Sequence, residues 1–183
     1  MKKTKRTKRL IAKVVAAVCA VVVVLGAGSA AIQQPTPAGD LEVATVERVV
    51  DGDTLKVDLN GSQERVRLIG VNAPESVHPD KTKNTQEGAT ASDHVKSILS
   101  PGDTVWLQKD VSDVDQYDRL LRYVWLEAPI DANSEEEARA KMLNAVLVAD
   151  GYADAKRYEP DVAYADLFEQ LEADRERQRP KQR

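Results

Sequence analysis

The chain has 183 residues, of which 42% are hydrophobic, and carries 26 Lys and Arg against 30 Asp and Glu. This length suits one globular domain with short appendages. With one cysteine, Cys19, and two histidines, the composition excludes a disulfide framework and a cysteine-based zinc site. It also gives little support to Ser-His-Asp or Cys-His catalysis.

The N-terminal segment has the layout of a secretory signal. Basic residues are concentrated in the first 13 positions, an uninterrupted apolar run covers residues 14–25, and small residues follow at 26–31. This order predicts cleavage near residues 29–31 and a secreted, extracellular product. The alternative is an uncleaved membrane anchor over residues 10–31, because the run reaches the lower length limit of a spanning helix when it is counted to Ala31.

Removal of residues 1–31 changes the charge of the product. That segment holds seven of the basic residues and no acidic one, so residues 32–183 keep 19 basic against 30 acidic residues, a net charge of −11. Such a charge weighs against binding to a polyanion. A bound divalent cation would reverse the local sign at a site.

The remaining chain divides into three parts. Residues 32–41 are rich in proline and polar residues and are interpreted as a linker. Residues 42–175 form the predicted domain, and residues 176–183 form a charged tail that we expect to fray.

Alternating apolar residues predict strands near 41–50, 54–59 and 65–71, joined at Asp-Gly and Asn-Gly turns. A helical period follows over residues 86–99, ended by Pro-Gly, and two further strands are predicted at 104–109 and 120–126. The acidic run after Ser134 predicts a helix start, with Gly151 at its end, and a last helix follows Pro160.

Five short strands with a helix between the third and fourth are the order of an OB-fold. We therefore predict an α+β fold, a five-stranded OB-fold barrel with about three helices, preceded by the signal or anchor segment. Small barrels of this kind commonly bind oligonucleotides.

Four segments together resemble the staphylococcal thermonuclease family over about residues 42–170. The Asp-Gly-Asp-Thr motif alone is weak, whereas the arginine- and glutamate-bearing motifs in this order and at these separations are specific. The segments are VVDGDT (49–54), VRLIGVNAPE (66–75), DQYDRLLRYVW (115–125) and MLNAVLVADGYA (142–153).

The resemblance implies a calcium-dependent nuclease that hydrolyses phosphodiester bonds in DNA and RNA by in-line water attack, leaving 3′-phosphate products. Carboxylate and carbonyl oxygens suit Ca²⁺, and the matched metal positions are Asp53, Asn72 and the backbone carbonyl of Ala73.

The other matched positions concern the phosphate and the nucleotide. Arg67 and Arg119 match the phosphate-binding arginines, whose planar forks suit phosphate oxygens. Glu75 matches the general base, or a group that positions the water. Tyr117 and Tyr158 match residues that contact the nucleotide, Tyr158 after a one-residue shift.

Three departures from the family pattern affect charge. Asn72 stands where the family usually has Asp, which predicts weaker calcium affinity; Gln116 replaces a common Lys, and Asp118 replaces a common Gly. These changes favour the competing hypothesis, a catalytically weakened or inactive OB-fold module that binds single-stranded nucleic acid or a protein partner.

The retained carboxylates and arginines favour the enzyme. For it we expect DNA and RNA partners, with single-stranded or unpaired regions preferred, and a monomer without an obligate protein partner. Contact with a membrane is expected only if the N-terminal segment stays uncleaved.

Overall fold

Alternating apolar side chains form the strands of a small barrel in the computed structural model, which describes residues 41–179. The barrel strands are β1 (Leu41–Asp51), β2 (Thr54–Leu59), β3 (Ser62–Leu68), β5 (Thr104–Gln108) and β6 (Leu120–Trp125). The predicted signal or anchor, the linker up to residue 40 and the last four residues of the tail lie outside the described residues.

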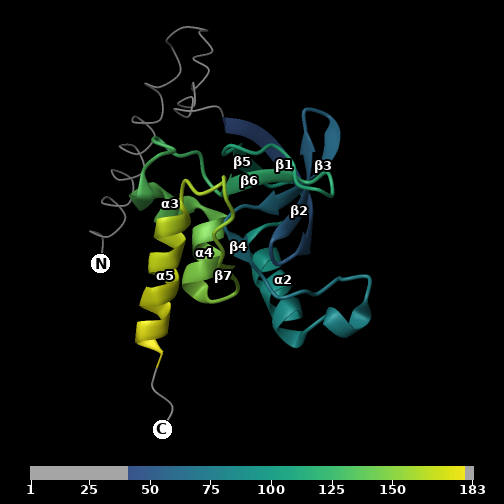
Figure 1. Cartoon of the computed structure of the whole chain (residues 1–183). Helices are drawn as coiled ribbons and strands as arrows, with labels where there is room; N and C mark the ends of the chain where they lie inside the picture. Colours follow the sequence, from purple (N-terminus) through teal and green to yellow (C-terminus); the bar gives the residue numbers. More distant parts are fainter. Residues whose placement is uncertain (1–40, 180–183) are drawn as a thin grey trace, which may run out of the picture. The chain divides into compact units, whose positions relative to one another are not determined.

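The five strands close into a barrel in the order β1-β2-β3-β6-β5 (Figure 1). β1 pairs antiparallel with both β2 and β5, whereas β3 pairs parallel with β6. Helix α2 (Gln86–Ile98) connects the third and fourth barrel strands. This is the topology of an OB-fold, so the predicted fold class is confirmed.

The third predicted strand begins and ends three residues earlier than expected and is followed by a separate small sheet. β3 ends at Leu68, and Gly70 turns the chain with a φ of 75°, a conformation that glycine adopts without steric cost. β4 (Val71–Asn72) then pairs with β7 (Asp154–Ala155). This pairing fixes Asn72 close to the end of β3.

The long helix predicted after Ser134 is two helices, α3 (Glu135–Lys141) and α4 (Leu143–Asp150). Ser134 caps α3 and Gly151 ends α4 with a φ of 83°, as predicted. Between them, Met142 is extended and forms a β-bridge with Trp125 of β6. The described chain therefore has four α-helices, because strand pairing interrupts the helical period at Met142.

The last helix, α5 (Ala165–Gln178), packs beside α4 (Figure 1). It continues beyond residue 175, where we expected the chain to fray, because Arg175 donates to the carbonyls of Val148 and Ala153. Within residues 41–179, no helix has the length and apolar content needed to cross a membrane.

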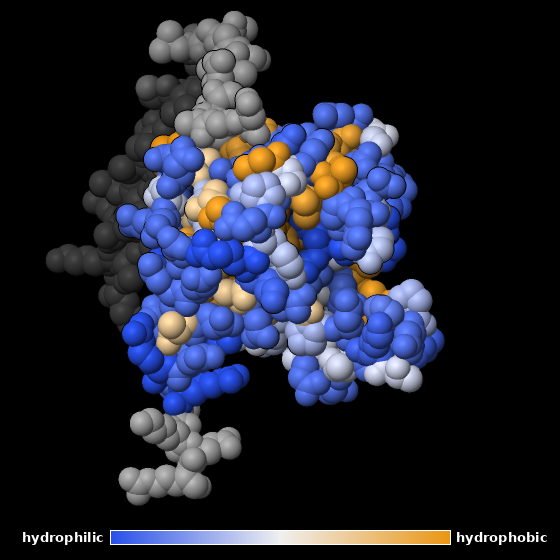
Figure 2. All heavy atoms as spheres, viewed as in Figure 1, coloured by the Kyte–Doolittle hydropathy of each residue, from blue (hydrophilic) through white to orange (hydrophobic). Residues whose placement is uncertain are grey.

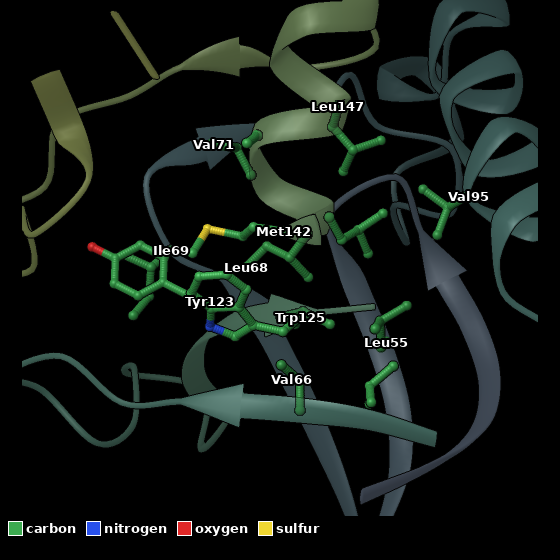
Figure 3. Close-up of a cluster of buried hydrophobic side chains, with 14 of the residues drawn as sticks. Leu55, Val66, Leu68, Ile69, Val71, Val95, Tyr123, Trp125, Met142 and Leu147 are labelled. Atoms are coloured by element: carbon green, nitrogen blue, oxygen red, sulfur yellow. The ribbon is translucent and has the colours of Figure 1, made fainter. Parts of the chain in front are cut away.

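The core lies between the barrel and the helices. Figure 3 shows Leu55, Val66 and Trp125 from the strands converging with Val95 of α2 and Leu147 of α4, all of them fully buried. Each such aliphatic side chain contributes about 1.5–3 kcal/mol by its burial. This packing makes the barrel a rigid support for the loops at its surface.

The surface is mostly hydrophilic, with apolar residues gathered at one end of the barrel on the face drawn in Figure 2. Several of the exposed large apolar side chains lie on connecting segments: Val111, Val114 and Tyr117 between β5 and β6, and Tyr158 after β7. Exposed aromatic side chains on loops are common where a ligand is bound.

Asn144 of α4 provides a test of how the helices are fixed to the barrel. Its buried amide accepts from the Val124 N–H at 3.0 Å and donates to the Ile69 carbonyl at 2.8 Å. Asn144→Ala leaves both buried groups without a partner, so we expect the free energy of unfolding to fall by about 2–5 kcal/mol in a urea titration. Asn133→Ala, at an exposed position, is the control, and an equal effect of both substitutions would contradict this account.

Candidate active site

Asp53 lies in the two-residue turn that joins β1 to β2, where Asp51 pairs with Thr54. Its side chain is buried, and each carboxylate oxygen has a partner. Oδ1 accepts from the Thr54 hydroxyl at 3.0 Å, and Oδ2 accepts from the Ala73 N–H at 3.0 Å. The local turn and the segment after β4 therefore hold the carboxylate in one orientation.

Arg67 faces Asp53 because β3 pairs with β2 in a register that sets Arg67 opposite Thr54. Its Nη1 lies 2.8 Å from Asp53 Oδ2, with both side chains largely buried. Its Nη2 donates to Asn72 Oδ1 at 3.4 Å. The Arg67 guanidinium thus bridges Asp53 and Asn72, two of the residues that the family resemblance assigns to the metal.

Ala73 contacts this cluster through its backbone N–H rather than its carbonyl. The N–H donates to Asp53, whereas the carbonyl accepts no hydrogen bond from the described residues. Its predicted role as a carbonyl ligand therefore stays a prediction.

Glu75 lies a short distance along the chain with an exposed side chain. Its backbone is fixed on two sides. The Glu75 carbonyl accepts from the Thr85 N–H at 2.9 Å. Gly88 of α2 packs so closely that a Cβ at position 88 would lie 2.2 Å from the carbonyl oxygen of Glu75. The next residue, Ser76, donates its hydroxyl to Asp51 at 2.5 Å. Asp51 is thus an anchor of the Glu75 segment, not merely a turn residue.

The Glu75 carboxylate is separate from the arginines in this conformation. Among residues 41–179, no hydrogen bond or ion pair joins it to Arg67 or Arg119, and it does not line the pocket described below. The structure therefore places Glu75 on a fixed backbone with a side chain that solvent can reach.

Arg119 is held within its own loop. Asp115 accepts from Arg119 Nε at 2.7 Å and from its backbone N–H at 3.0 Å, and Nη2 lies 2.6 Å from the same carboxylate. The guanidinium carbon is 5.4 Å from the centre of the Tyr117 ring, within the range of a cation–π contact. Arg119 therefore has a defined direction before any ligand binds.

A pocket of about 450 Å³ brings four of the predicted residues together: Arg67, Arg119, Tyr117 and Tyr158. Its wall also includes Asp115, Glu159 and Asp161. Two positive groups and two exposed aromatic rings around one concavity suit an anionic ligand with a flat ring.

Asp115 and Asp161 were missed as site residues by the sequence analysis. Asp161 is buried and accepts from the Ser112 N–H at 2.7 Å, which ties the turn carrying Tyr158 to the loop carrying Tyr117. For Asp115, the available signal was its separation of four residues from Arg119 across a turn. For Asp161, no local sequence pattern indicates a role in the site.

The donor set around Asp53 is compatible with a hard cation. Carboxylate and amide oxygens of Asp53 and Asn72 both face the Arg67 guanidinium, so they already surround a positive charge. No group of three His, Cys, Asp or Glu side chains able to hold a metal occurs among the described residues. A calcium ion here would therefore complete its shell with backbone carbonyls and water.

The features described so far define a class of protein: a small OB-fold barrel that presents two arginines, two tyrosines and an oxygen-donor cluster on one side. A family model described as "Staphylococcal nuclease homologue" matches residues 65–180. The chain belongs to this family of nucleases, and the predicted family and enzyme class are confirmed. The matched range includes Arg67, Asn72, Glu75 and Arg119, and Asp53 precedes it.

Curated relatives agree with this assignment. The chain is 40% identical over 127 residues to "Thermonuclease" of Staphylococcus intermedius, an alignment that covers 69% of this chain and 67% of the relative. It is 39% identical over 127 residues to "Thermonuclease" of Staphylococcus hyicus, with the same coverage. "Endonuclease YncB" of Bacillus subtilis (strain 168) is 35% identical over 126 residues, 68% of this chain and 53% of the relative.

The ion pair of Arg119 predicts a pH dependence of stability. Burial would raise the pKa of Asp115, but hydrogen bonds from the Arg119 side chain and from the backbone of Arg119 and Tyr117 outweigh it and lower the pKa. A carboxyl with a lowered pKa stabilises the fold above its unfolded value, about 3.9, and loses that contribution as the pH falls through the folded pKa.

We therefore expect Asp115→Asn to be less stable than the parent at pH 7 and to approach it as the pH falls below about 4. Urea titrations at several pH values measure this difference. Asp93→Asn on the exposed face of α2 is the control. A stability difference for Asp115→Asn that stays constant down to the acid limit would refute the linkage.

Proposed function

We propose that the chain is a calcium-dependent nuclease that hydrolyses phosphodiester bonds in DNA and RNA. The observation that carries the proposal is the position of Arg67, which bridges Asp53 and Asn72 and also lines the pocket with Arg119. Oxygen ligands for a cation and guanidinium groups for a phosphate therefore meet at one side chain. Membership in a nuclease family supports nucleic acids as the substrates.

Each residue has a separate task in this proposal. Arg67 and Arg119 bind the non-bridging oxygens of the scissile phosphate and stabilise the charge that develops on them. Asp53, Asn72 and the Ala73 carbonyl would hold calcium, which would supply Lewis-acid polarisation of the phosphate. Tyr117 and Tyr158 stack on or contact the nucleotide beside the scissile bond.

Glu75 takes the proton of the attacking water, or orients that water, from its fixed backbone at the start of the loop before α2. The water oxygen forms a bond to phosphorus as the bond to the 5′-oxygen breaks. The leaving 5′-oxygen takes a proton from solvent, so the products are a 3′-phosphate and a free 5′-hydroxyl. The exposed position of Glu75 leaves its carboxylate accessible to the solvent that supplies the water.

Three further properties belong to the same proposal. Exposed tyrosines at the pocket favour single-stranded or unpaired regions, whose bases are free to stack. The enzyme acts as a monomer without an obligate protein partner. The signal-like N-terminal segment supports export from the cell, and an uncleaved segment would instead keep the enzyme at the membrane.

The decisive experiment compares the full chain with Asn72→Asp and Glu75→Gln on single-stranded DNA and RNA, with calcium or with chelator. We expect cleavage by the parent only with calcium. Asn72→Asp adds a carboxylate, so it should lower the calcium concentration for half-maximal rate by about tenfold. Glu75→Gln should lower kcat by about 100-fold or more.

The results separate three cases. Cleavage that persists in chelator would refute the calcium dependence. Absence of cleavage in the parent at high calcium, with activity restored in Asn72→Asp, would show a metal site too weak to function. Full activity of Glu75→Gln would remove Glu75 from the mechanism.

Asp118 offers an independent test of the phosphate subsite. It has a φ of 57° and places a negative charge next to Arg119. Asp118→Gly removes that charge, so we expect a KM for single-stranded DNA about two- to fivefold lower at low ionic strength, with the gain vanishing near 1 M salt.

Asn60→Gly is a matched control, because Asn60 has a φ of 55° in the exposed turn between β2 and β3. Both substitutions give glycine the same left-handed conformation, so their effects on stability should be similar. An equal fall of KM in both variants would show that the charge of Asp118 has no part in substrate binding.

A further inference from the structure

The segment that presents Tyr117 and Arg119 is a short hairpin, residues 113–121, which follows β5 and includes the first two residues of β6. The Leu121 N–H donates to the Asp113 carbonyl at 2.8 Å, and the Asp115 N–H donates to the Arg119 carbonyl at 2.9 Å. A β-bridge joins Val114 to Leu120 between these bonds. The tip of the hairpin is therefore residues 116–118, and its base is Asp113.

Arg122 contacts Asp113 at the base of this hairpin. It is a β6 residue only 3% exposed, and its guanidinium donates to the Asp113 carbonyl at 3.0 Å and to Asp113 Oδ1 at 2.9 Å. The remaining nitrogen, Nε, donates to Glu42 Oε2 at 2.8 Å. One buried cation thus connects the first barrel strand to the base of the hairpin.

The energetics of this arrangement point to orientation rather than stability. Burying a guanidinium has a large desolvation cost, and its ion pairs offset that cost without a large surplus. An aliphatic side chain would fill the same place in the barrel without that cost. What an aliphatic residue cannot supply is a pair of directed hydrogen bonds to one residue of the loop.

The far end of the hairpin has a second anchor, because Arg65 of β3 donates to the Tyr117 carbonyl at 2.8 Å. Lys109 Nζ also lies 3.6 Å from Asp113 Oδ1, a longer contact. The tip is thus tied to β3 through Arg65, and the base to β6 through Arg122. The barrel itself sets the direction of Tyr117 and Arg119.

We propose that Arg122 is a positioning residue for nucleic-acid binding. It acts through Asp113 to hold the 113–121 hairpin in place as part of the pocket wall. The inference rests on the proposed function, since it takes Tyr117 and Arg119 as substrate contacts. It predicts that the contact of Arg122 with Asp113 controls KM, whereas its contact with Glu42 does not.

Removal of Arg122 itself could unfold the barrel, so the test removes its two acidic partners one at a time in the full chain. Asp113→Ala and Glu42→Ala each delete a half-exposed carboxylate from the same guanidinium. We expect Asp113→Ala to raise KM for single-stranded DNA about three- to tenfold with kcat within twofold of the parent. Glu42→Ala should leave both constants within twofold.

Asp113→Asn is the conservative rescue, because its amide keeps an oxygen at the Oδ1 position. It should return KM to within about twofold of the parent. Unfolding midpoints of all three variants, measured in urea, separate positioning from general loss of stability. Equal increases of KM in Asp113→Ala and Glu42→Ala, or no increase in either, would overturn the proposal.

A binding measurement keeps this test independent of cleavage. Fluorescence anisotropy of a labelled single-stranded oligonucleotide with calcium, with Glu75→Gln present in every variant to slow cleavage, gives Kd with little turnover. A parent that binds but does not cleave with calcium would refute the proposed function. A loss of affinity specific to Asp113→Ala would still support the role of Arg122, and unchanged affinity would refute it.

Discussion

The contact on which the site depends is the ion pair of Asp53 with Arg67. Asp53 is only 8% exposed, so its charge requires a partner, and removing one member of such a buried pair costs about 3–5 kcal/mol. The partner comes from β3, two residues before the chain leaves the barrel. Because side chains alternate along a strand, a shift of one residue between β2 and β3 would turn Arg67 to the core face. The register of the barrel therefore determines whether the site exists.

The two site arginines are oriented in different ways. Arg67 is held by a carboxylate from another strand, whereas Arg119 is held by Asp115 within the same hairpin. The first arrangement needs the closed barrel, and the second needs only a local turn. In both cases a phosphate would meet a guanidinium whose direction is already set, which lowers the entropy cost of binding. The same carboxylates compete with the phosphate for the guanidinium, so each arginine must share or exchange its partner.

Much of the fold was predictable because its signals are local. The alternation of β1 and β2, the cap at Ser134 and the left-handed Gly151 all act within a few residues. The break at Met142 was not predictable, because the apolar period continues through it and only pairing with Trp125 interrupts the helix. The early end of β3 likewise depends on the partner of β4, strand β7, which lies more than 80 residues away in sequence.

The same difference between local and long-range signals applies to the site. Family motifs identified Asp53, Arg67 and Asn72, and the structure brings these three together; their chemical roles stay predictions. The contribution of Arg122 was not visible, because its partners Glu42 and Asp113 lie 80 and 9 residues away in sequence. The link from Asp161 to Ser112 spans 49 residues. Residues that hold functional groups in place are harder to find than the groups themselves, since their partners are brought together only by tertiary contacts.

The acidic composition of the domain affects the electrostatics of the site. Residues 32–183 carry a net charge of −11, and both pocket arginines are paired with carboxylates, so the pocket has little free positive charge of its own. A polyanion would therefore be attracted weakly by this surface. In the proposed enzyme, calcium held by Asp53 and Asn72 would supply the missing charge. Substrate binding by such an enzyme would depend on the cation more strongly than in a basic nuclease. The amide of Asn72, which lacks the charge of a carboxylate, would leave more of the cation's charge for the phosphate.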